Sequence, residues 1–232
     1  MEIFGFELRI MIKEPLTIEK LEQIIKEKKM KQLIEYAEND FFDAKGSFYN
    51  LHDPNEKHEL CKDVTAFINN DGGYLIIGCE TEKPITHALE FVKDAKGIVD
   101  FPNMDSVYSI FSEYIYPNNI GTFISNEQIT TDDKKKFLVF KINKNEEGKP
   151  YFVKKTAVNR EYIAYYIRTY DRAIRFHIEY LHELVHQGIY FERYLKNLTG
   201  ASAKILDNTE KLIGKTKKSI LLGMRYDIKK DL

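Results

Sequence analysis

The stretch of sequence that decides the fold covers residues 66–78 and reads AFINNDGGYLIIG. Its first residues continue a helical pattern in which Leu60 and Phe67 share an apolar stripe. Asn70-Asp71-Gly72-Gly73 then predicts the end of that helix, because these residues tolerate positive φ. The apolar run Tyr74–Cys79 follows at once and is typical of a central strand that is buried on both faces. A helix, a glycine turn and a buried strand in this order predict an α/β domain.

Upstream of this stretch the pattern alternates between helix and strand. Asp53 followed by Pro54 predicts the start of the helix that ends near Asn69, since the carboxylate can accept hydrogen bonds from free amides and proline suits the first turn. We expect three earlier elements, which are a helix capped by Thr17, a second helix over about Lys29–Glu38, and a strand within Phe41–Tyr49.

Downstream, one helix and several strands are expected. The helix is predicted to be capped by Asp105 and closed by Pro117. The strands are predicted over Gly121–Ser125, Phe137–Ile142, Tyr151–Lys154 and Tyr162–Arg168, and a long helix over about Asp171–Leu195. These elements predict an α/β (α+β) fold with a mixed, mainly antiparallel sheet flanked by helices and a C-terminal helical extension.

Composition and charge narrow the functional classes. The 232 residues carry a formal net charge of -1, which excludes a histone-like binder, and 43% are hydrophobic, which argues against disorder. Residues 203–232 hold eight basic and four acidic side chains, so the remaining chain is acidic. Two cysteines, Cys61 and Cys79, fit packing in a reducing, cytoplasmic protein. Apolar runs are too short to cross a membrane.

Three acidic residues are expected where secondary-structure elements end. Glu38 closes the second predicted helix, Asp43 lies on the following strand, and Glu80 comes directly after the buried strand. Lys45 shares a strand face with Asp43. Converging carboxylates can hold Mg²⁺ or Mn²⁺, and a nearby lysine can neutralise a phosphate. The alternative interpretation is that these residues only cap helices or lie on the solvated surface.

Three segments resemble motifs of a known family, the AlbA-like domain of Schlafen proteins and their prokaryotic relatives. Residues 38–45 (ENDFFDAK) resemble the family's glutamate followed, five residues later, by Glu-Phe-Lys. Residues 66–78 are similar to its Ala-Phe-x-Asn-x-x-Gly-Gly-x-hydrophobic-Gly signature, which is the most specific of the three. Residues 148–151 (GKPY) and 166–168 (YIR) resemble its late Pro-Tyr and Tyr-x-Arg strands.

The resemblance implies a domain organisation and a function. Residues 33–176 would form the Schlafen AlbA-like domain, preceded by a helical lead-in over 1–32 and followed by a helix and basic tail over 177–232. Among eukaryotic Schlafens the family's acidic triad supports metal-dependent cleavage of structured RNA such as tRNA, whereas prokaryotic relatives are often described as ATP-binding proteins or transcriptional regulators. RNA or DNA is therefore the expected partner, and a homodimer is compatible with the sequence.

Carried onto this chain, the resemblance implies specific site residues. The catalytic, metal-holding set would be Glu38, Asp43 and Glu80 with Lys45 beside it. Contacts to the nucleic-acid backbone are expected from Lys45, Lys154, Lys155, Arg168 and Arg172. The expected cofactor is Mg²⁺ or Mn²⁺.

The chain departs from the family pattern at three positions. Asp43 stands where glutamate is usual, which shortens the side chain by one methylene, and Ala44 replaces a bulky apolar residue. Tyr170 occupies a position where glycine usually follows the Tyr-x-Arg strand, so we expect a different loop shape after Arg168. A carboxylate is nevertheless present at all three acidic positions.

A rival pattern lies in the predicted long helix. His182-Glu183-Leu184-Val185-His186 fits the HExxH motif of zinc peptidases, in which two histidines one turn apart bind Zn²⁺ and the glutamate is the general base. Ile189 occupies the place of the glycine of one peptidase branch, and the histidines flank an apolar stripe where half-exposed histidines are ordinary.

A phosphate-binding loop is not supported. Gly214-Lys215-Thr216 echoes the end of such a loop, but Thr209 stands where its first glycine is required, so ATP binding is not expected. Three functional classes remain, in the order in which the sequence favours them: a nucleic-acid-binding protein, in its sharpest form a metal-dependent endoribonuclease; a non-catalytic DNA-binding or interaction module; and a zinc peptidase.

Overall fold

The computed structural model describes residues 14–83, 89–145, 150–154 and 164–175. The chain divides into two units, Met1–His177 and Ile178–Leu232, and every described residue belongs to the first. Within the described residues, no helix has the length and apolar character needed to span a membrane.

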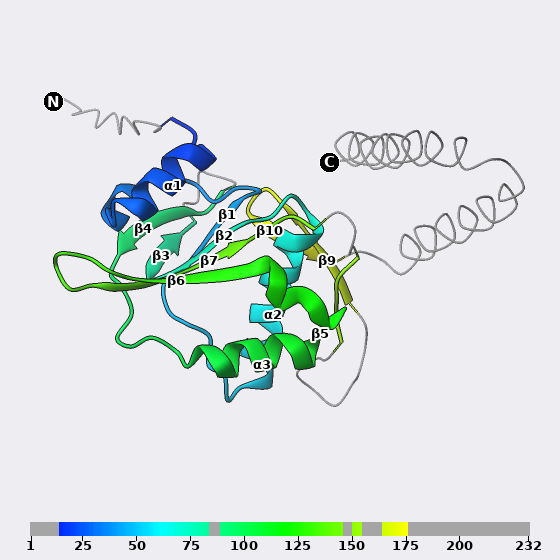
Figure 1. Ribbon diagram of the computed structural model, residues 1–232. Coiled ribbons are helices and arrows are strands. Elements are labelled where there is room, and N and C mark those ends of the chain that lie inside the picture. Colours follow the sequence, from blue (N-terminus) through cyan, green and yellow to red (C-terminus); the bar gives the residue numbers. More distant parts are fainter. Residues whose placement is uncertain (1–13, 84–88, 146–149, 155–163, 176–232) are drawn as a thin grey trace, which may run out of the picture. The chain divides into compact units, whose positions relative to one another are not determined.

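A four-stranded sheet forms the centre of the first unit (Figure 1). Its strand order is β1-β2-β7-β6. The central pair is β2 (Gly73–Ile77) and β7 (Lys136–Ile142), and the edges are β1 (Phe42–Lys45) and β6 (Ile124–Thr130). β1 and β2 are parallel, whereas β7 is antiparallel to both β2 and β6. This mixed, mainly antiparallel sheet confirms the predicted fold class.

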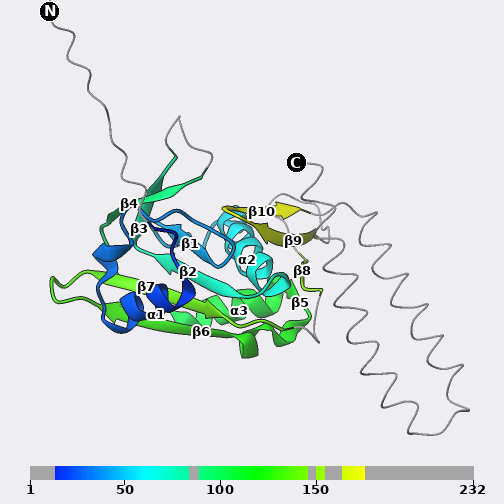
Figure 2. The same cartoon turned by 90° about the horizontal axis from the view of Figure 1, so that it is seen from above.

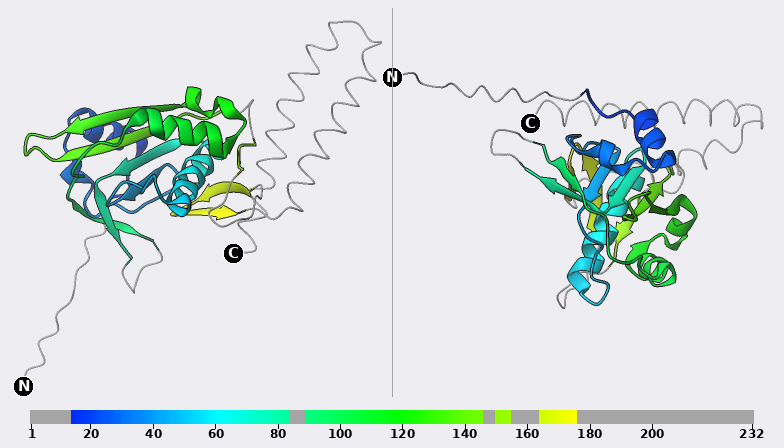
Figure 3. Two further views of the ribbon diagram at one scale, coloured as in Figure 1. Left: turned by 90° about the horizontal axis from the view of Figure 1, so that it is seen from below. Right: turned by 90° about the vertical axis from the view of Figure 1, so that its left-hand side faces the viewer.

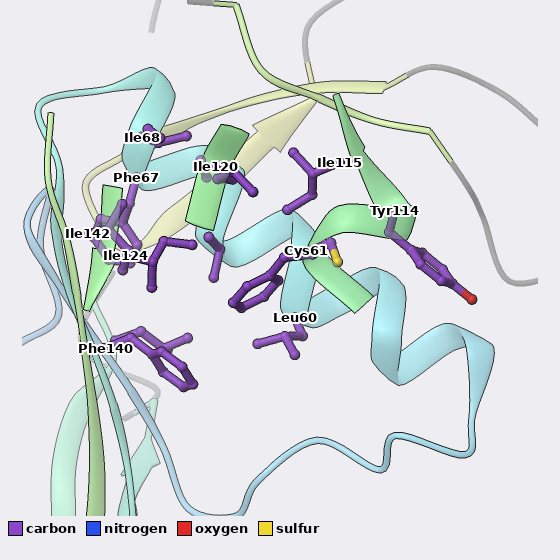
Figure 4. Close-up of a cluster of buried hydrophobic side chains, with 14 of the residues drawn as sticks. Leu60, Cys61, Phe67, Ile68, Tyr114, Ile115, Ile120, Ile124, Phe140 and Ile142 are labelled. Carbon is purple, nitrogen blue, oxygen red and sulfur yellow. The ribbon is translucent and has the colours of Figure 1, made fainter. Parts of the chain in front are cut away.

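Helices cover both faces of this sheet. α1 (Ile18–Lys26) lies on one face, and α2 (Pro54–Asn69) and α3 (Met104–Tyr114) lie on the other (Figure 3). Alternation along the strands supplies the two apolar surfaces: Leu75 and Ile77 of β2 belong to the cluster beneath α2 and α3 (Figure 4), while Tyr74 and Ile76 belong to the cluster beneath α1. The predicted burial of this strand on both faces is confirmed.

The connection from α2 to β2 shows why residues 66–78 have the sequence they do. Asp53 caps α2 by accepting from the Asn55 amide, as predicted. At the other end, Gly72 adopts φ +80, and a Cβ there would come within 2.5 Å of the Ile142 carbonyl oxygen. Only glycine therefore lets the chain turn this tightly against β7.

Asn69, the last residue of α2, joins the helix to two strands of a second sheet. Its Nδ2 donates to the carbonyls of Tyr151 (2.8 Å) and Tyr166 (2.9 Å), and its Oδ1 accepts from the Tyr151 amide at 2.8 Å. The asparagine is buried, so these three bonds satisfy backbone groups that water does not reach. The asparagine of the motif thus fixes the position of the second sheet against α2.

This second sheet lies beside α2 (Figure 2) and has the order β10-β9-β8-β5. Its strands are β5 (Ile115–Tyr116), β8 (Phe152–Val153), β9 (Ala164–Thr169) and β10 (Arg172–Arg175). A separate antiparallel pair, β3 (Cys79–Glu82) and β4 (Phe91–Ala95), and two 3-10 helices, η1 (Met30–Leu33) and η2 (Asn118–Phe123), complete the described elements.

Four sequence predictions are wrong in detail. The predicted second helix is only the short η1, because Glu35 takes φ +72 and the chain then pairs with β4. α3 is capped by Asn103, two residues before the predicted Asp105, because the Asn103 side chain accepts from the amides of residues 105 and 106. The predicted strand Gly121–Ser125 is mostly η2, and the predicted helix from Asp171 begins instead as β10; residues 176–195 lie outside the described residues.

Candidate functional site

Glu38 enters the site from an extended segment that precedes β1. Its amide donates to the Glu90 carbonyl at 2.9 Å, beside an isolated bridge between Ala37 and Phe91. The expectation that Glu38 closes a helix is therefore wrong, because pairing with the β4 edge extends the chain here. The side chain is only 2% exposed, and its Oε1 accepts from the amide of Ala44 at 3.0 Å. Glu38 is thus tied to the strand that carries the other predicted site residues.

Asp43 and Lys45 project from β1 towards α2. Alternation requires this, because Phe42 and Ala44 pack into the apolar cluster on the α1 side. Asp43 is 1% exposed, and Lys45 Nζ binds both of its carboxylate oxygens, at 2.9 and 3.1 Å. The Lys45 side chain remains 36% exposed, so the ion pair lies at the boundary between core and solvent.

Arg168 reaches the same carboxylates from β9. Its Nη2 lies 3.3 Å from Asp43 Oδ1 and 3.8 Å from Glu38 Oε2. The guanidinium also donates to the carbonyls of Asn39 (2.8 Å) and Phe42 (3.0 Å) and lies 4.7 Å from the centroid of the Phe67 ring. The residue is 4% exposed, so Arg168 holds the second sheet to β1 and does not present its charge to solvent.

A third buried carboxylate, Asp63 of α2, belongs to the same cluster and was missed in the sequence. Its Oδ2 accepts from the Tyr49 hydroxyl at 2.6 Å and lies 3.9 Å from Lys45 Nζ. The signal was present, because Asp63 falls within the apolar stripe of α2, three residues after Leu60 and four before Phe67. A charged residue on such a stripe predicts a buried partner.

These residues together form what we call the ionic cluster, defined as Glu38, Asp43, Asp63, Lys45 and Arg168. It contains three carboxylates and two permanent cations. Burial, with the charge of Asp43 adding to it, raises the pKa of Glu38 to about 9. Glu38 therefore keeps its proton at neutral pH, and the cluster is close to charge balance.

The proton on Glu38 is held beside an ionised partner. Burial alone would raise the pKa of Asp43, but the Arg168 guanidinium and the Lys45 ammonium outweigh it, and the pKa lies below its usual value. A hydrogen bond between the two carboxyl groups raises the pKa of Glu38 and lowers the pKa of Asp43, because Glu38 donates its proton and Asp43 accepts. Because the two pKa values shift in opposite directions, Glu38 is the protonated acid and Asp43 is the ionised base.

The remaining two members respond to the same neighbours. Burial raises the pKa of Asp63, and the charge of Asp43 adds to this effect. Burial opposes the charged form of Lys45, but the carboxylates of Asp63 and Asp43 prevail and raise the pKa of Lys45 above its ordinary value. Lys45 thus stays charged and bridges the two aspartates.

Glu80, the third residue of the predicted metal set, is not part of the ionic cluster. It lies on β3 near the end of β1, since a Cβ on Gly46 would be 3.5 Å from the Glu80 Cα. Its carboxylate pairs with Lys96, and its side chain is 42% exposed. Among the described residues, no three histidine, cysteine, aspartate or glutamate side chains are gathered so that they could hold a metal ion.

The donor set in this conformation does not fit a resident Mg²⁺ or Mn²⁺. Both ions prefer ionised oxygen ligands. Asp43 is engaged by Lys45 and Arg168, Glu38 carries a proton, and Glu80 faces Lys96. The predicted metal site therefore requires a rearrangement of Glu80 and the loss of the Glu38 proton.

Comparison with known proteins identifies the family. The family model described as "Schlafen, AlbA_2" matches residues 38–176, which is more than half of the chain. The chain belongs to this family. No curated protein and no solved structure matches the chain.

The Schlafen AlbA_2 match begins at Glu38 and contains every member of the ionic cluster. The motifs from which the resemblance was stated supply four of its members, Glu38, Asp43, Lys45 and Arg168, whereas Asp63 of α2 lies outside them. Family membership indicates a nucleic-acid-binding domain. At the departure from the family pattern, Tyr170 takes φ +55, a conformation that glycine adopts without strain.

The other predicted contact residues of this Schlafen AlbA_2 chain lie in different environments. Arg172 is exposed on β10. Lys154 donates to the Asn118 side chain at 3.1 Å and to the Ser112 carbonyl at 3.3 Å. Lys155, the zinc motif with His182 and His186, and the segment around Lys215 lie outside the described residues.

Proposed function

We propose that this Schlafen AlbA_2 protein binds nucleic acid, with RNA as its principal ligand, and that the partly exposed Lys45 and the exposed Arg172 contact its phosphates. The observation that carries the proposal is that the family match coincides with the charge-balanced ionic cluster. Three uncompensated carboxylates would repel phosphate, whereas Arg168, Lys45 and the proton on Glu38 remove that repulsion.

The test is a fluorescence anisotropy titration of the full chain with a labelled single-stranded RNA, a tRNA and a DNA duplex. We expect saturable binding, tighter for RNA, with the logarithm of the affinity falling linearly with the logarithm of salt, by about 0.7 for each phosphate contact to a single strand. Absence of saturable binding to all three ligands at low salt would refute the proposed function. If the protein binds the DNA duplex as tightly as RNA or more tightly, the proposal of nucleic-acid binding stands, but RNA is not the principal ligand.

Arg172→Ala gives a residue-level prediction. If the exposed guanidinium neutralises one phosphate, its loss should weaken RNA binding by a few-fold and reduce the salt slope by about 0.7. The matched control is Lys20→Ala, because Lys20 is exposed on α1, on the opposite face of the central sheet. An identical salt slope for wild type and Arg172→Ala would show that Arg172 makes no phosphate contact.

Metal-dependent RNA cleavage is the second candidate function. The observation that favours it is the closeness of the Glu80 backbone to Gly46, the residue that follows β1, although the Glu80 carboxylate itself pairs with Lys96. Incubating tRNA with wild type and Glu80→Ala, with Mn²⁺, Mg²⁺ or a chelator, tests it. We expect metal-dependent products from wild type only; equal products from both proteins, or none from either, would exclude a cleavage role for Glu80.

A further inference from the structure

Tyr170 occupies an unusual backbone position at the turn between β9 and β10. Thr169 pairs with Arg172, so Tyr170 and Asp171 are the two residues of the turn. Tyr170 has φ +55, in the left-handed region that glycine enters freely and a tyrosine enters only with strain. Such strain persists where the surrounding structure imposes it and is a reason to look for a function.

The surrounding contacts hold this turn in place. The Tyr170 amide donates to the Asp40 carboxylate, which lies in the segment leading into β1. Two residues earlier on the same strand, Arg168 binds the carbonyls of Asn39 and Phe42. The backbone of the turn is therefore held at Tyr170, and through Arg168 of β9, against residues 39–42.

The ring itself is not used in the core. Tyr170 is 51% exposed and belongs to neither apolar cluster of the described residues. An exposed aromatic ring on a fixed backbone loses little conformational entropy when a ligand packs against it.

An exposed cationic side chain, Arg172, follows Tyr170 by two residues on the same hairpin. Ala173 packs against the core, so alternation sends its neighbours Arg172 and Ile174 to the outer face. The Arg172 side chain is 66% exposed, and its contact with the Asp171 carboxylate is long, at 3.7 Å. An aromatic platform next to a basic group that can bind phosphate is the combination by which proteins hold unpaired nucleotides.

We propose that Tyr170 stacks on an unpaired base of the bound nucleic acid while Arg172 contacts the phosphate beside it. This inference rests on the proposed function and deepens it, because it selects single-stranded or locally unpaired segments as the ligand. A fully paired duplex offers no free base face to the ring. An apolar protein partner fits less well, since the exposed Arg172 lies only two residues from the ring in the chain.

The test compares Tyr170→Gly with Tyr170→Phe in anisotropy titrations against a short labelled single-stranded RNA. Glycine suits the left-handed backbone but removes the ring, so affinity should fall roughly fivefold to a hundredfold. Phenylalanine keeps the ring, so its affinity should stay within about twofold of wild type. The salt slope should be unchanged in both variants, because no phosphate contact is lost.

Further measurements separate stacking from a structural role. The melting temperature of Tyr170→Gly should equal or exceed that of wild type, because the backbone strain is relieved. Wild type should prefer single strands to duplex, and Tyr170→Gly should lose that preference. Wild-type affinity in Tyr170→Gly would overturn the stacking role and leave the proposed function intact. If wild type itself binds no nucleic acid, both proposals fall together.

Discussion

Replacing Arg168 by alanine is expected to lower the free energy of unfolding by about 3–5 kcal/mol, the cost typical of breaking a buried ion pair from one side. The substitution removes one of the two counter-charges of Asp43 and one of the two donors to each of the carbonyls of Asn39 and Phe42, which keep only the backbone bonds between these two residues. It also removes the contact between β9 and the Phe67 ring of α2. For a domain of this size the melting temperature should fall by roughly 6–20 °C, which thermal unfolding monitored by circular dichroism measures.

Two variants control this prediction. Arg168→Lys keeps the charge but loses the planar, multiple hydrogen bonding, so an intermediate loss is expected. Arg172→Ala, an exposed arginine on the neighbouring strand, should change the free energy of unfolding by less than about 0.5 kcal/mol. If Arg168→Ala unfolded at the wild-type temperature, the ionic cluster would not hold the two sheets together.

Glu38→Gln and Asp43→Asn, two nearly isosteric changes on adjacent carboxyls, are expected to shift stability in opposite directions. The glutamine amide mimics the protonated acid of Glu38, so at about pH 8 this variant should be more stable than wild type by roughly 2–4 kcal/mol. Asp43→Asn removes the ionised partner of Arg168 and Lys45 and should cost roughly 2–3 kcal/mol, because Glu38 can ionise and supply part of the lost charge. Urea unfolding of the three proteins measures both differences.

The pH dependence follows from the same pair. Glu38 has a pKa of about 9 in the folded chain against 4.5 for an ordinary glutamate, so across this range the folded state holds a proton that the unfolded state has released. The stabilising contribution of Glu38 is therefore complete below about pH 4.5 and is lost as the pH rises towards 9, by up to about 1.4 kcal/mol per pH unit.

A glutamine side chain cannot titrate, so the Glu38→Gln variant should lose this part of the pH dependence. Glu27→Gln is the matched control. Glu27 is exposed at the C-cap of α1, and this variant keeps Glu38, so it should retain the wild-type dependence of stability on pH. A wild-type slope in Glu38→Gln would show that Glu38 is ionised in the folded protein.

Local chemistry made much of the fold predictable. The helix that begins at Asp53, the glycine turn and β2 all appear where the sequence places them, because each depends on neighbours in the chain. β7 also lies where the sequence predicts a strand, and its nearly continuous apolar run fits burial on both faces of the central sheet. Family resemblance then brought Asp43, Lys45 and Arg168 to one site before the structure did.

Contacts distant in sequence account for the errors. The segment before Glu38 has helical periodicity, yet it pairs with β4, more than 50 residues later, which no local pattern reports. Glu80 was grouped with Asp43 because acidic residues were expected where elements end and because the family resemblance groups them, but its carboxylate pairs with Lys96, which follows β4. Arg168 was expected to contact the nucleic-acid backbone because the family resemblance places it in the Tyr-x-Arg motif, and only the packing of β9 on α2 shows that it is buried.

The salt dependence of RNA affinity tests the central claim most directly. We predict that the full chain binds single-stranded RNA saturably at about 50 mM salt, and that raising the salt to about 200 mM weakens this binding by a factor set by a few phosphate contacts. Arg172→Ala should shift that slope, whereas Lys20→Ala should not. Failure to bind RNA at low salt by a folded protein would contradict the account.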